Sequence, residues 1–422
     1  MENATHWVNH LQFNPAGDRF ARGLACESIA RGHAPLREYA RDPPGLSRRE
    51  QRLKGFTHAL ALDALGQGLP LHVFHGDEMD AVLLADVFAF RADARAETLV
   101  PGGVLFVADA LAMPVHWYYN REALLRDYGP IRSYLAPRNP HPDSILWRSQ
   151  FVSPGEGFDI LHDQRPFWGQ RGVHYHQFLR AGENTLNLQC ARLLMESLHH
   201  CGQYDAGDYL KRYIAFMTTP GRHRDTYAEE YHRHFFTRLA SGFSPRQCGI
   251  PEKHIGGLLG MVPIIAHYRM DPREGSACAQ EHLALTHRGS RMATAAALVM
   301  DILQQVIAGA SLRRVLEDGM RSQHSPYFGH PFHKWQDATD DDVVGRHLST
   351  ACYVEDALPA VIYLAWKYAH DPEQGLIANC HVGGDNAHRG ALLGAFFGAD
   401  GGVATFPESW VAGLLEPVPD LL

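Results

Sequence analysis

Four polar residues crowd into one turn near the end of the chain. The stretch HVGGDNAHRGALLGAFFGA, residues 381–399, places Asp385, Asn386, His388 and Arg389 directly after two glycines. Asp385 and His388 are three residues apart, so their side chains share one side of a helix start. A histidine beside a carboxylate is a candidate general base near neutral pH. We predict Asp385 and His388 as a catalytic pair, with Asn386 and Arg389 binding substrate, for example a phosphate at the helix N-terminus.

The same turn also has a purely structural explanation. Asp385 directly precedes an expected helix, where its carboxylate can accept backbone N–H groups as an N-cap. Gly390, Gly394 and Gly398 share one helix face, and each costs about 1 kcal/mol of helix propensity relative to alanine. Such a face predicts close packing against another helix. A cap and a packing face explain the acid and the glycines, but not the polar crowding of the first turn.

A second polar group precedes an apolar helical pattern. Glu183 and Asn184 lie in a loop, Thr185 stands at the expected helix start, and Asn187 lies in its first turn. Thr185 could cap this helix, and the others would then be ordinary loop residues. The alternative is that Glu183, Asn184 and Asn187 bind substrate.

A third candidate lies inside an apolar segment. Asp109 stands in VADALAMPVHWYYN, residues 107–120, and a buried carboxylate is costly unless it is hydrogen-bonded or bound to a cation. It therefore either bonds the N-terminus of another helix or binds a metal. His116 either caps the end of this helix or faces the site. His174 and His176 are further candidates for polar groups of the site.

The bulk composition narrows the class of protein. Of the 422 residues, 45% are hydrophobic and 20% charged, as in folded globular proteins. A net charge of −8 without a basic cluster argues against nucleic-acid binding. The N-terminus has no signal-peptide pattern, and no apolar run is long enough to span a membrane. The seven cysteines are scattered without Cys-x-x-Cys spacing, which favours a reducing, cytoplasmic setting.

The elements that must position these residues are helices. Strand-like alternation is nearly absent, residues 151–177 form one long irregular segment, and we predict an all-α fold. Residues 1–98 are predicted to be a helical N-terminal extension of unknown role, and residues 99–416 one domain. Apolar residues recur at helical spacing over 104–119, 185–201, 205–217, 226–240, 256–268, 292–311 and 356–371.

Taken in order, the three polar segments resemble motifs of the ADP-ribosylglycohydrolase family. VADALAMP (107–114) is similar to the family's Gly-Asp-Ala-Leu-Gly-x-Pro pattern. TLNLQCARLLMESL (185–198) is similar to a helix that opens with Thr-Asp-Asp-Thr and runs to Glu-Ser-Leu. GGDNAHRGALLGAFFGA (383–399) is similar to Gly-Gly-Asp-x-Asp-Thr followed by a Gly/Ala-rich helix. The resemblance covers roughly 99–416 and implies an all-helical hydrolase that removes ADP-ribose from proteins or related conjugates.

The resemblance also implies a pair of Mg²⁺ ions, but most of the ligands that hold them are replaced. Thr185 and Asp385 stand at ligand positions, whereas two aspartates of the second motif are Leu186 and Asn187. In the last motif, the second aspartate and the threonine are Ala387 and His388. One of four acidic ligands remains, and Mg²⁺ needs such oxygens.

If a metal binds at all, the expected ligands of a single ion are Thr185, Asp385 and Asp109. The set is incomplete for Mg²⁺, whereas the histidines would also admit Mn²⁺ or Zn²⁺. His116 aligns near a glutamate that helps orient substrate in the family, and we predict it to bind substrate.

The predicted function is a divergent ADP-ribosylglycohydrolase-like hydrolase that cleaves a glycosidic bond. Its substrate would be a small ADP-ribosyl or nucleoside-like molecule or an ADP-ribosylated protein. The alternative is a non-catalytic protein that binds ADP-ribose or a nucleotide in the same cleft. A third alternative, an enzyme of another reaction class that reuses the pocket, also stays open.

Overall fold

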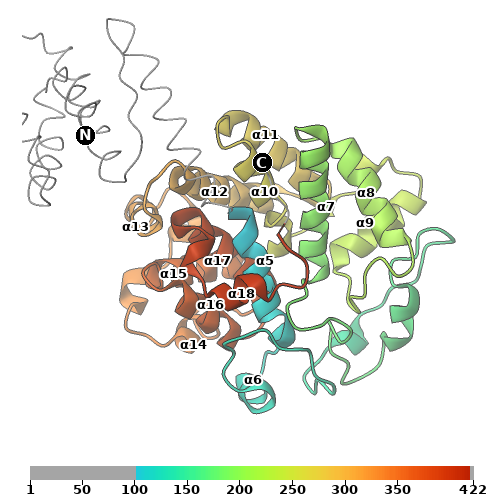
Figure 1. Cartoon of the computed structure of the whole chain (residues 1–422), viewed down its shortest axis with the longest axis horizontal. Coiled ribbons are helices and arrows are strands. Elements are labelled where there is room, and N and C mark those ends of the chain that lie inside the picture. Colours follow the sequence, from blue (N-terminus) through green and yellow to red (C-terminus); the bar gives the residue numbers. More distant parts are fainter. Residues whose placement is uncertain (1–100, 419–422) are drawn as a thin grey trace, which may run out of the picture. The chain divides into compact units, whose positions relative to one another are not determined.

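The computed structural model describes residues 101–418, which are mostly helical (Figure 1). The predicted all-α fold is confirmed. Two short parallel strands, β1 (Ile250–Pro251) and β2 (His287–Arg288), pair within this range. The predicted extension, residues 1–98, lies outside the described residues, and the division of the chain at residue 99 stays a prediction.

Each segment that the apolar periodicity predicts as helical contains a helix, but residues 256–268 divide into a 3-10 turn, Ile255–Leu258, and a seven-residue helix, Met261–His267. Further helices that the periodicity did not predict lie between them. None of the helices in residues 101–418 has the length and apolar character that crossing a bilayer requires. The α-helices are α5 (Pro101–Ala112), α6 (Arg121–Tyr128), α7 (Leu186–Cys201), α8 (Ala206–Thr218), α9 (Glu230–Ala240), α10 (Met261–His267), α11 (Pro272–Ala284), α12 (Ser290–Ile307), α13 (Leu312–Ser322), α14 (Asp340–Val343), α15 (Val354–Lys367), α16 (Pro372–His381), α17 (Asn386–Gly401) and α18 (Glu408–Ala412).

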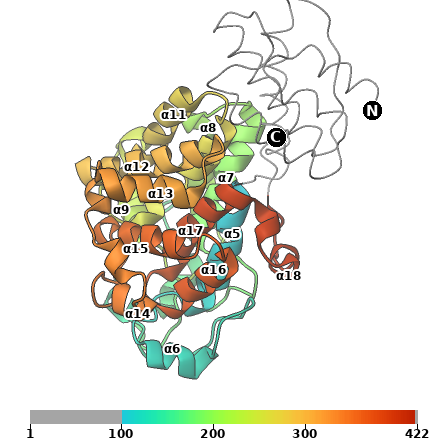
Figure 2. The ribbon, with the colours of Figure 1, turned by 90° about the vertical axis from the view of Figure 1, so that its left-hand side faces the viewer.

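Helices α5 and α17 lie side by side and are covered by the others (Figures 1 and 2). Gly394 allows this close approach, because a Cβ atom there would lie 2.7 Å from Cβ of Ala108 and 2.8 Å from the carbonyl oxygen of Val104. A Cβ at Gly390 would lie 2.6 Å from Nδ2 of Asn379 on α16, and in ordinary contact, 3.5 Å, with the carbonyl oxygen of Ala108. The predicted packing role is therefore confirmed for Gly390 and Gly394.

Helix α5 is shorter than the predicted segment 104–119. It ends at Ala112, and a 3-10 turn, Met113–Val115, follows with Pro114 near its start. Proline interrupts an α-helix because it lacks the N–H group and its ring clashes with the preceding turn. The chain turns away here, and Trp117 adopts a left-handed backbone with φ of 61°. This turn brings His116 to the first turn of α17.

Candidate functional site

The turn Gly383–Gly384 fixes the start of α17. Both glycines have positive φ, 68° and 67°, a conformation that glycine adopts without strain. The Gly384 N–H donates to the carbonyl of Tyr118 at 2.7 Å, and the Asp385 N–H donates to that of Thr350 at 2.9 Å. A side chain at Gly384 would overlap the Thr350 carbonyl. The backbone that carries Asp385 is therefore held from two sides.

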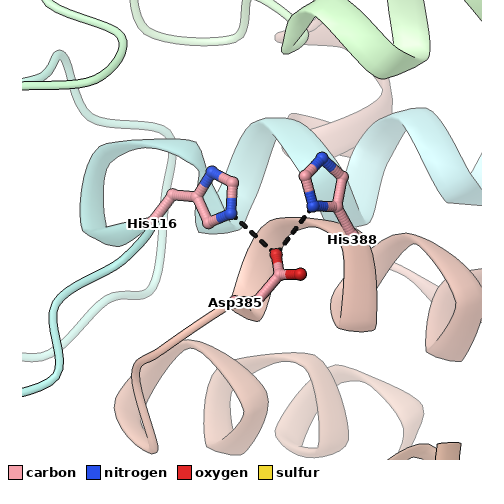
Figure 3. Close-up of side chains that lie close together, drawn as sticks. All are labelled: His116, Asp385 and His388. Atoms are coloured by element: carbon pink, nitrogen blue, oxygen red, sulfur yellow. Dashed lines mark hydrogen bonds and ion pairs between the residues drawn. The ribbon is translucent and has the colours of Figure 1, made fainter. Parts of the chain in front are cut away.

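The Asp385 carboxylate accepts hydrogen bonds from two imidazole rings. Nε2 of His116 and Nδ1 of His388 each lie 2.7 Å from the same oxygen, Oδ1 (Figure 3). All three side chains are fully buried. Asp385 occupies the N-cap position of α17, but its side chain accepts no backbone N–H of that helix. The predicted capping bond is wrong because the two histidines take its place.

The hydrogen bonds continue from His116 to a second carboxylate. Nδ1 of His116 lies 2.7 Å from Nε2 of His176. Nδ1 of His176 lies 2.6 Å from Oδ1 of Asp225, and the other oxygen of Asp225 accepts the Leu186 N–H at 2.9 Å. A buried chain of carboxylate, two imidazoles and carboxylate therefore connects the start of α7 to the start of α17.

The middle link of this chain depends on a further proton. His116 faces Asp385 through Nε2 and His176 faces Asp225 through Nδ1, so the link between the two rings needs a third proton on them. Burial lowers the pKa of His116 well below its usual range, which opposes a second proton on that ring.

The far side of the His388 ring faces Glu229 and Asn187. Nε2 of His388 lies 3.4 Å from Oε1 of Glu229 and contacts the amide of Asn187. Asn187 also donates to Glu229 at 3.2 Å, and its amide oxygen accepts from Tyr231 and from Nε2 of His232. Asn187 therefore lies beside His388 and Glu229, and its predicted role in binding substrate stays a prediction.

Burial and neighbouring charges shift the pKa values of Asp385, His388 and Glu229. Burial by itself raises the pKa of Asp385, but the charge of His388 and the two histidine hydrogen bonds hold it well below its usual range. Burial lowers the pKa of His388, but the charge and hydrogen bond of Asp385 outweigh burial and raise it to about 9. Burial raises the pKa of Glu229 to about 7. These shifts favour an ion pair between Asp385 and His388, and they bring the pKa of Glu229 close to neutrality.

The second oxygen of Asp385 faces a different side of the site. Oδ2 accepts no hydrogen bond from a described residue, and Nε2 of His254 lies 3.5 Å from it without a partner of its own. The partly exposed Cys352 also lies within 4.8 Å of the Asp385 and His254 ligand atoms. This is the side on which the site comes nearest to solvent.

Asp109 forms a separate buried cluster with the start of α7. Its Oδ2 accepts from the Thr185 N–H at 2.8 Å and from Nδ2 of Asn184 at 3.0 Å, and its Oδ1 accepts from the Thr185 hydroxyl at 2.7 Å. Of the two alternatives for Asp109, bonding to another helix N-terminus is the one present. Thr185 occupies the N-cap position of α7, but its side chain makes no capping bond, so that prediction is wrong.

Three residues predicted to bind substrate have partners elsewhere. The Asn386 amide donates to the carbonyls of Val115 and Cys380 at 3.2 and 3.0 Å. Arg389 is fully buried and donates to Asn379 and to the Gly383 carbonyl at 2.8 and 2.7 Å, rather than facing a phosphate at the helix start. Glu183 pairs with Arg180 and Arg224. These contacts hold loops in place, and substrate binding by the three residues stays a prediction.

The residues around Asp385 do not fit a pair of magnesium ions. Mg²⁺ takes oxygen ligands in near-octahedral geometry. The atoms within reach of the Asp385 carboxylate are ring nitrogens of His116, His388 and His254 and the Cys352 sulfur. Asp109, another predicted ligand, already accepts hydrogen bonds on both oxygens.

A softer ion has two candidate ligand sets among the described residues. One is His116, Asp385 and His388, and the other is His254, Cys352 and Asp385. Such nitrogen, sulfur and oxygen sets are typical of Zn²⁺. In the first set both rings donate protons to Asp385. In the second, Nδ1 of His254 accepts the Gly256 N–H at 3.0 Å, so the ring proton lies on Nε2, the atom that would bind the ion. A metal ion in either set would have to displace ring protons.

Sequence reasoning missed several groups of this site. Asp225 and Glu229 lie in RDTYAEEYH, residues 224–232, just before and at the start of an aromatic helix. Their four-residue spacing in an aromatic context was a usable signal for two buried acids. Nothing in the local pattern marks His254 or Cys352, which the fold brings to Asp385 from distant positions.

The comparisons with known proteins agree with the predicted resemblance. Residues 103–422 match the family described as ADP-ribosylglycohydrolase. One matching solved structure is described as an "ADP-ribosylglycohydrolase-related protein complex", at 18% identity and a TM-score of 0.46, and the alignment covers 74% of this chain and 92% of that one. No curated protein sequence matches. Because the family match spans most of the sequence, the chain belongs to the ADP-ribosylglycohydrolase family.

Proposed function

We propose that this chain is a hydrolase that cleaves an N- or O-glycosidic bond of an ADP-ribosyl or nucleoside-like substrate without a divalent cation. The observation that supports this most is the arrangement of Asp385 and His388. An ionised carboxylate and a protonated imidazole lie 2.7 Å apart at the position where the family resemblance implies metal ligands.

Glycosidic cleavage needs negative charge and a proton donor rather than a metal as such. Its transition state resembles an oxocarbenium ion, which a carboxylate stabilises while an acid protonates the leaving atom. Asp385 supplies the charge, and Oδ2 is its oxygen without a hydrogen bond.

His388 serves as acid and then as base. Its proton passes to the leaving nitrogen or oxygen as the bond to ribose C1 breaks. Water then adds to C1, and the neutral imidazole accepts the proton that this water loses. Glu229, with a pKa of about 7, buffers the far side of the ring. The pKa of His388 makes it a proton donor at the start of the reaction, so its predicted role as a base falls in the second step.

The burial of the site supports a second candidate function. Asp385, His388 and His116 are each 0% exposed and hydrogen-bond to one another. A site filled by its own side chains also suits a protein that binds ADP-ribose or a nucleotide without cleaving it.

The experiment that separates these functions is an assay with the full-length chain. It is incubated with an ADP-ribosylated peptide and with small ADP-ribosyl conjugates, in Mg²⁺, in Mn²⁺ and in EDTA. Turnover that persists in EDTA and is lost in Asp385→Asn supports the metal-independent hydrolase. The exposed Asp301→Asn is the matched control and should retain activity, because the Asp301 side chain is 49% exposed. Turnover that strictly requires Mg²⁺ refutes the proposal. Tight ADP-ribose binding without turnover supports the second candidate.

A further inference from the structure

Two buried carboxylates lie beside the ring of His388, one at each nitrogen. Asp385 precedes α17 and Glu229 precedes α9. Nδ1 of His388 bonds Asp385 at 2.7 Å, and Nε2 lies 3.4 Å from Glu229. The ring is the group common to both carboxylates.

Buried carboxylates require a compensating cation, since an isolated buried charge is strongly unfavourable. In the described residues, the ion pairs of Asp385 and Glu229 are all with histidines. His388 also stands where the family resemblance implies a threonine metal ligand. The His388 side chain therefore extends from α17 into the space between Asp385 and Glu229.

We propose that the imidazole ring of His388 takes the place of a divalent cation in this chain. The ring lies between Asp385 and Glu229, with one nitrogen toward each. The ring itself then blocks metal binding between these two carboxylates. This inference does not depend on whether the chain turns over a substrate.

If the ring of His388 blocks metal binding, a variant without the ring should bind a divalent cation. Removing the ring frees Oδ1 of Asp385 from one hydrogen bond and opens the space beside Oε1 of Glu229, which lies 3.4 Å from Nε2 of the ring. Oε2 of Glu229 already lacks a hydrogen-bond partner among the described residues. Such an oxygen-rich set suits Mg²⁺ or Mn²⁺.

The test measures Mn²⁺ binding by the full-length chain. Binding is detected as the loss of the free-ion signal in electron paramagnetic resonance. Wild type, His388→Ala and His282→Ala are stripped with EDTA and titrated with MnCl₂. We expect His388→Ala to bind about one ion per chain, at least about tenfold more tightly than wild type. His282 is the matched control, because it is a buried histidine whose pKa is lowered by burial alone, without a carboxylate nearby. Its removal should create no metal site.

Two further measurements separate metal binding from misfolding. Mn²⁺ should raise the melting temperature of His388→Ala and leave that of wild type unchanged, because a ligand stabilises only the state that binds it. The double variant His388→Ala with Asp385→Asn should lose the gained site.

Stoichiometric Mn²⁺ binding by wild type would overturn the proposal. So would a folded His388→Ala that binds no more tightly than His282→Ala. If His388→Ala does not fold, an Mn²⁺-dependent rise in the wild-type melting temperature would refute the proposal, and its absence would support it.

Discussion

His116 and His176 hydrogen-bond to each other ring to ring, with 2.7 Å between Nδ1 of His116 and Nε2 of His176. The second nitrogen of each ring hydrogen-bonds to a carboxylate, Asp385 for His116 and Asp225 for His176. The link joins residues 60 positions apart in the chain and belongs to the core of the site.

The ring-to-ring bond should be visible in solution. Protons in short hydrogen bonds between buried imidazoles and carboxylates are strongly deshielded and protected from exchange with water. We expect downfield N–H signals in one-dimensional proton NMR of the wild type, and their loss or shift in His176→Gln. His282→Ala serves as the control and should keep them. Identical downfield spectra of wild type and His176→Gln would contradict the chain of hydrogen bonds.

Removing the Asp385 charge should destabilise the protein. Asp385→Asn leaves a protonated His388 buried beside a neutral amide, and breaking one partner of a buried ion pair costs about 3–5 kcal/mol. Urea unfolding of the full-length chain measures the loss. Asp301→Asn changes only a surface pair 3.7 Å from His324, which is worth about 0–1 kcal/mol. Equal stability of the two variants would show that the pair is not a net-stabilising unit.

Stability should fall as pH rises above neutrality. The pKa of His388 is about 9 in the folded protein against an ordinary value of 6.5, so folding favours the protonated ring. Its contribution is complete below pH 6.5 and is lost as pH rises through about 9, by about 3 kcal/mol. The pKa of Glu229 is about 7 in the folded protein against an ordinary value of 4.5, so its contribution to stability also falls as pH rises, but over the lower range from 4.5 to about 7. Urea midpoints from pH 6 to 9.5 test this, and His388→Gln should flatten the slope above pH 7. A wild-type midpoint that rises over this range would contradict the assigned charges.

The contact between α5 and α17 leaves no room for a methyl group. In Gly394→Ala the new Cβ would lie 2.7 Å from Ala108 and 2.8 Å from the Val104 carbonyl, and overpacking of this kind costs about 1–3 kcal/mol. Gly207→Ala is the control, because Gly207 is exposed and the nearest atom to its new Cβ is a side-chain oxygen, Oδ1 of Asp205, at 3.1 Å. Thermal unfolding compares the two. A Gly394→Ala protein as stable as wild type would show that the helices can separate without cost.

The elements that periodicity predicts are the long apolar ones, and those it missed begin with a different signal. Helices α11 and α16 each start with an Asp–Pro step, in which Asp271 or Asp371 accepts an N–H of the first turn and proline fixes φ. Their apolar faces are short, so a search for long hydrophobic patterns does not detect them.

The sequence indicates the part of the candidate site that lies in its three polar segments. Asp385 and His388 share one turn, and we also predicted His116 and Asn187 as site residues. Glu229 and Asp225 belong to none of these segments, so only the fold reveals that they reach the site. The same limit explains the capping predictions for Asp385 and Thr185, which describe the local backbone correctly but not the competing tertiary partners.

The Gly383–Gly384 turn has a consequence for the motions of the molecule. The amide hydrogens of Gly384 and Asp385 donate to the carbonyls of Tyr118 and Thr350, which belong to separate segments. Because both residues of the turn are glycines, these backbone segments approach the turn closely. Exposing these amides requires both segments to move away together. We expect hydrogen exchange at Gly384 and Asp385 to proceed only through global unfolding, as slowly as in the centres of α5 and α17. A site that opened independently of the core would exchange much faster, so this rate distinguishes a rigid reaction centre from a gated one.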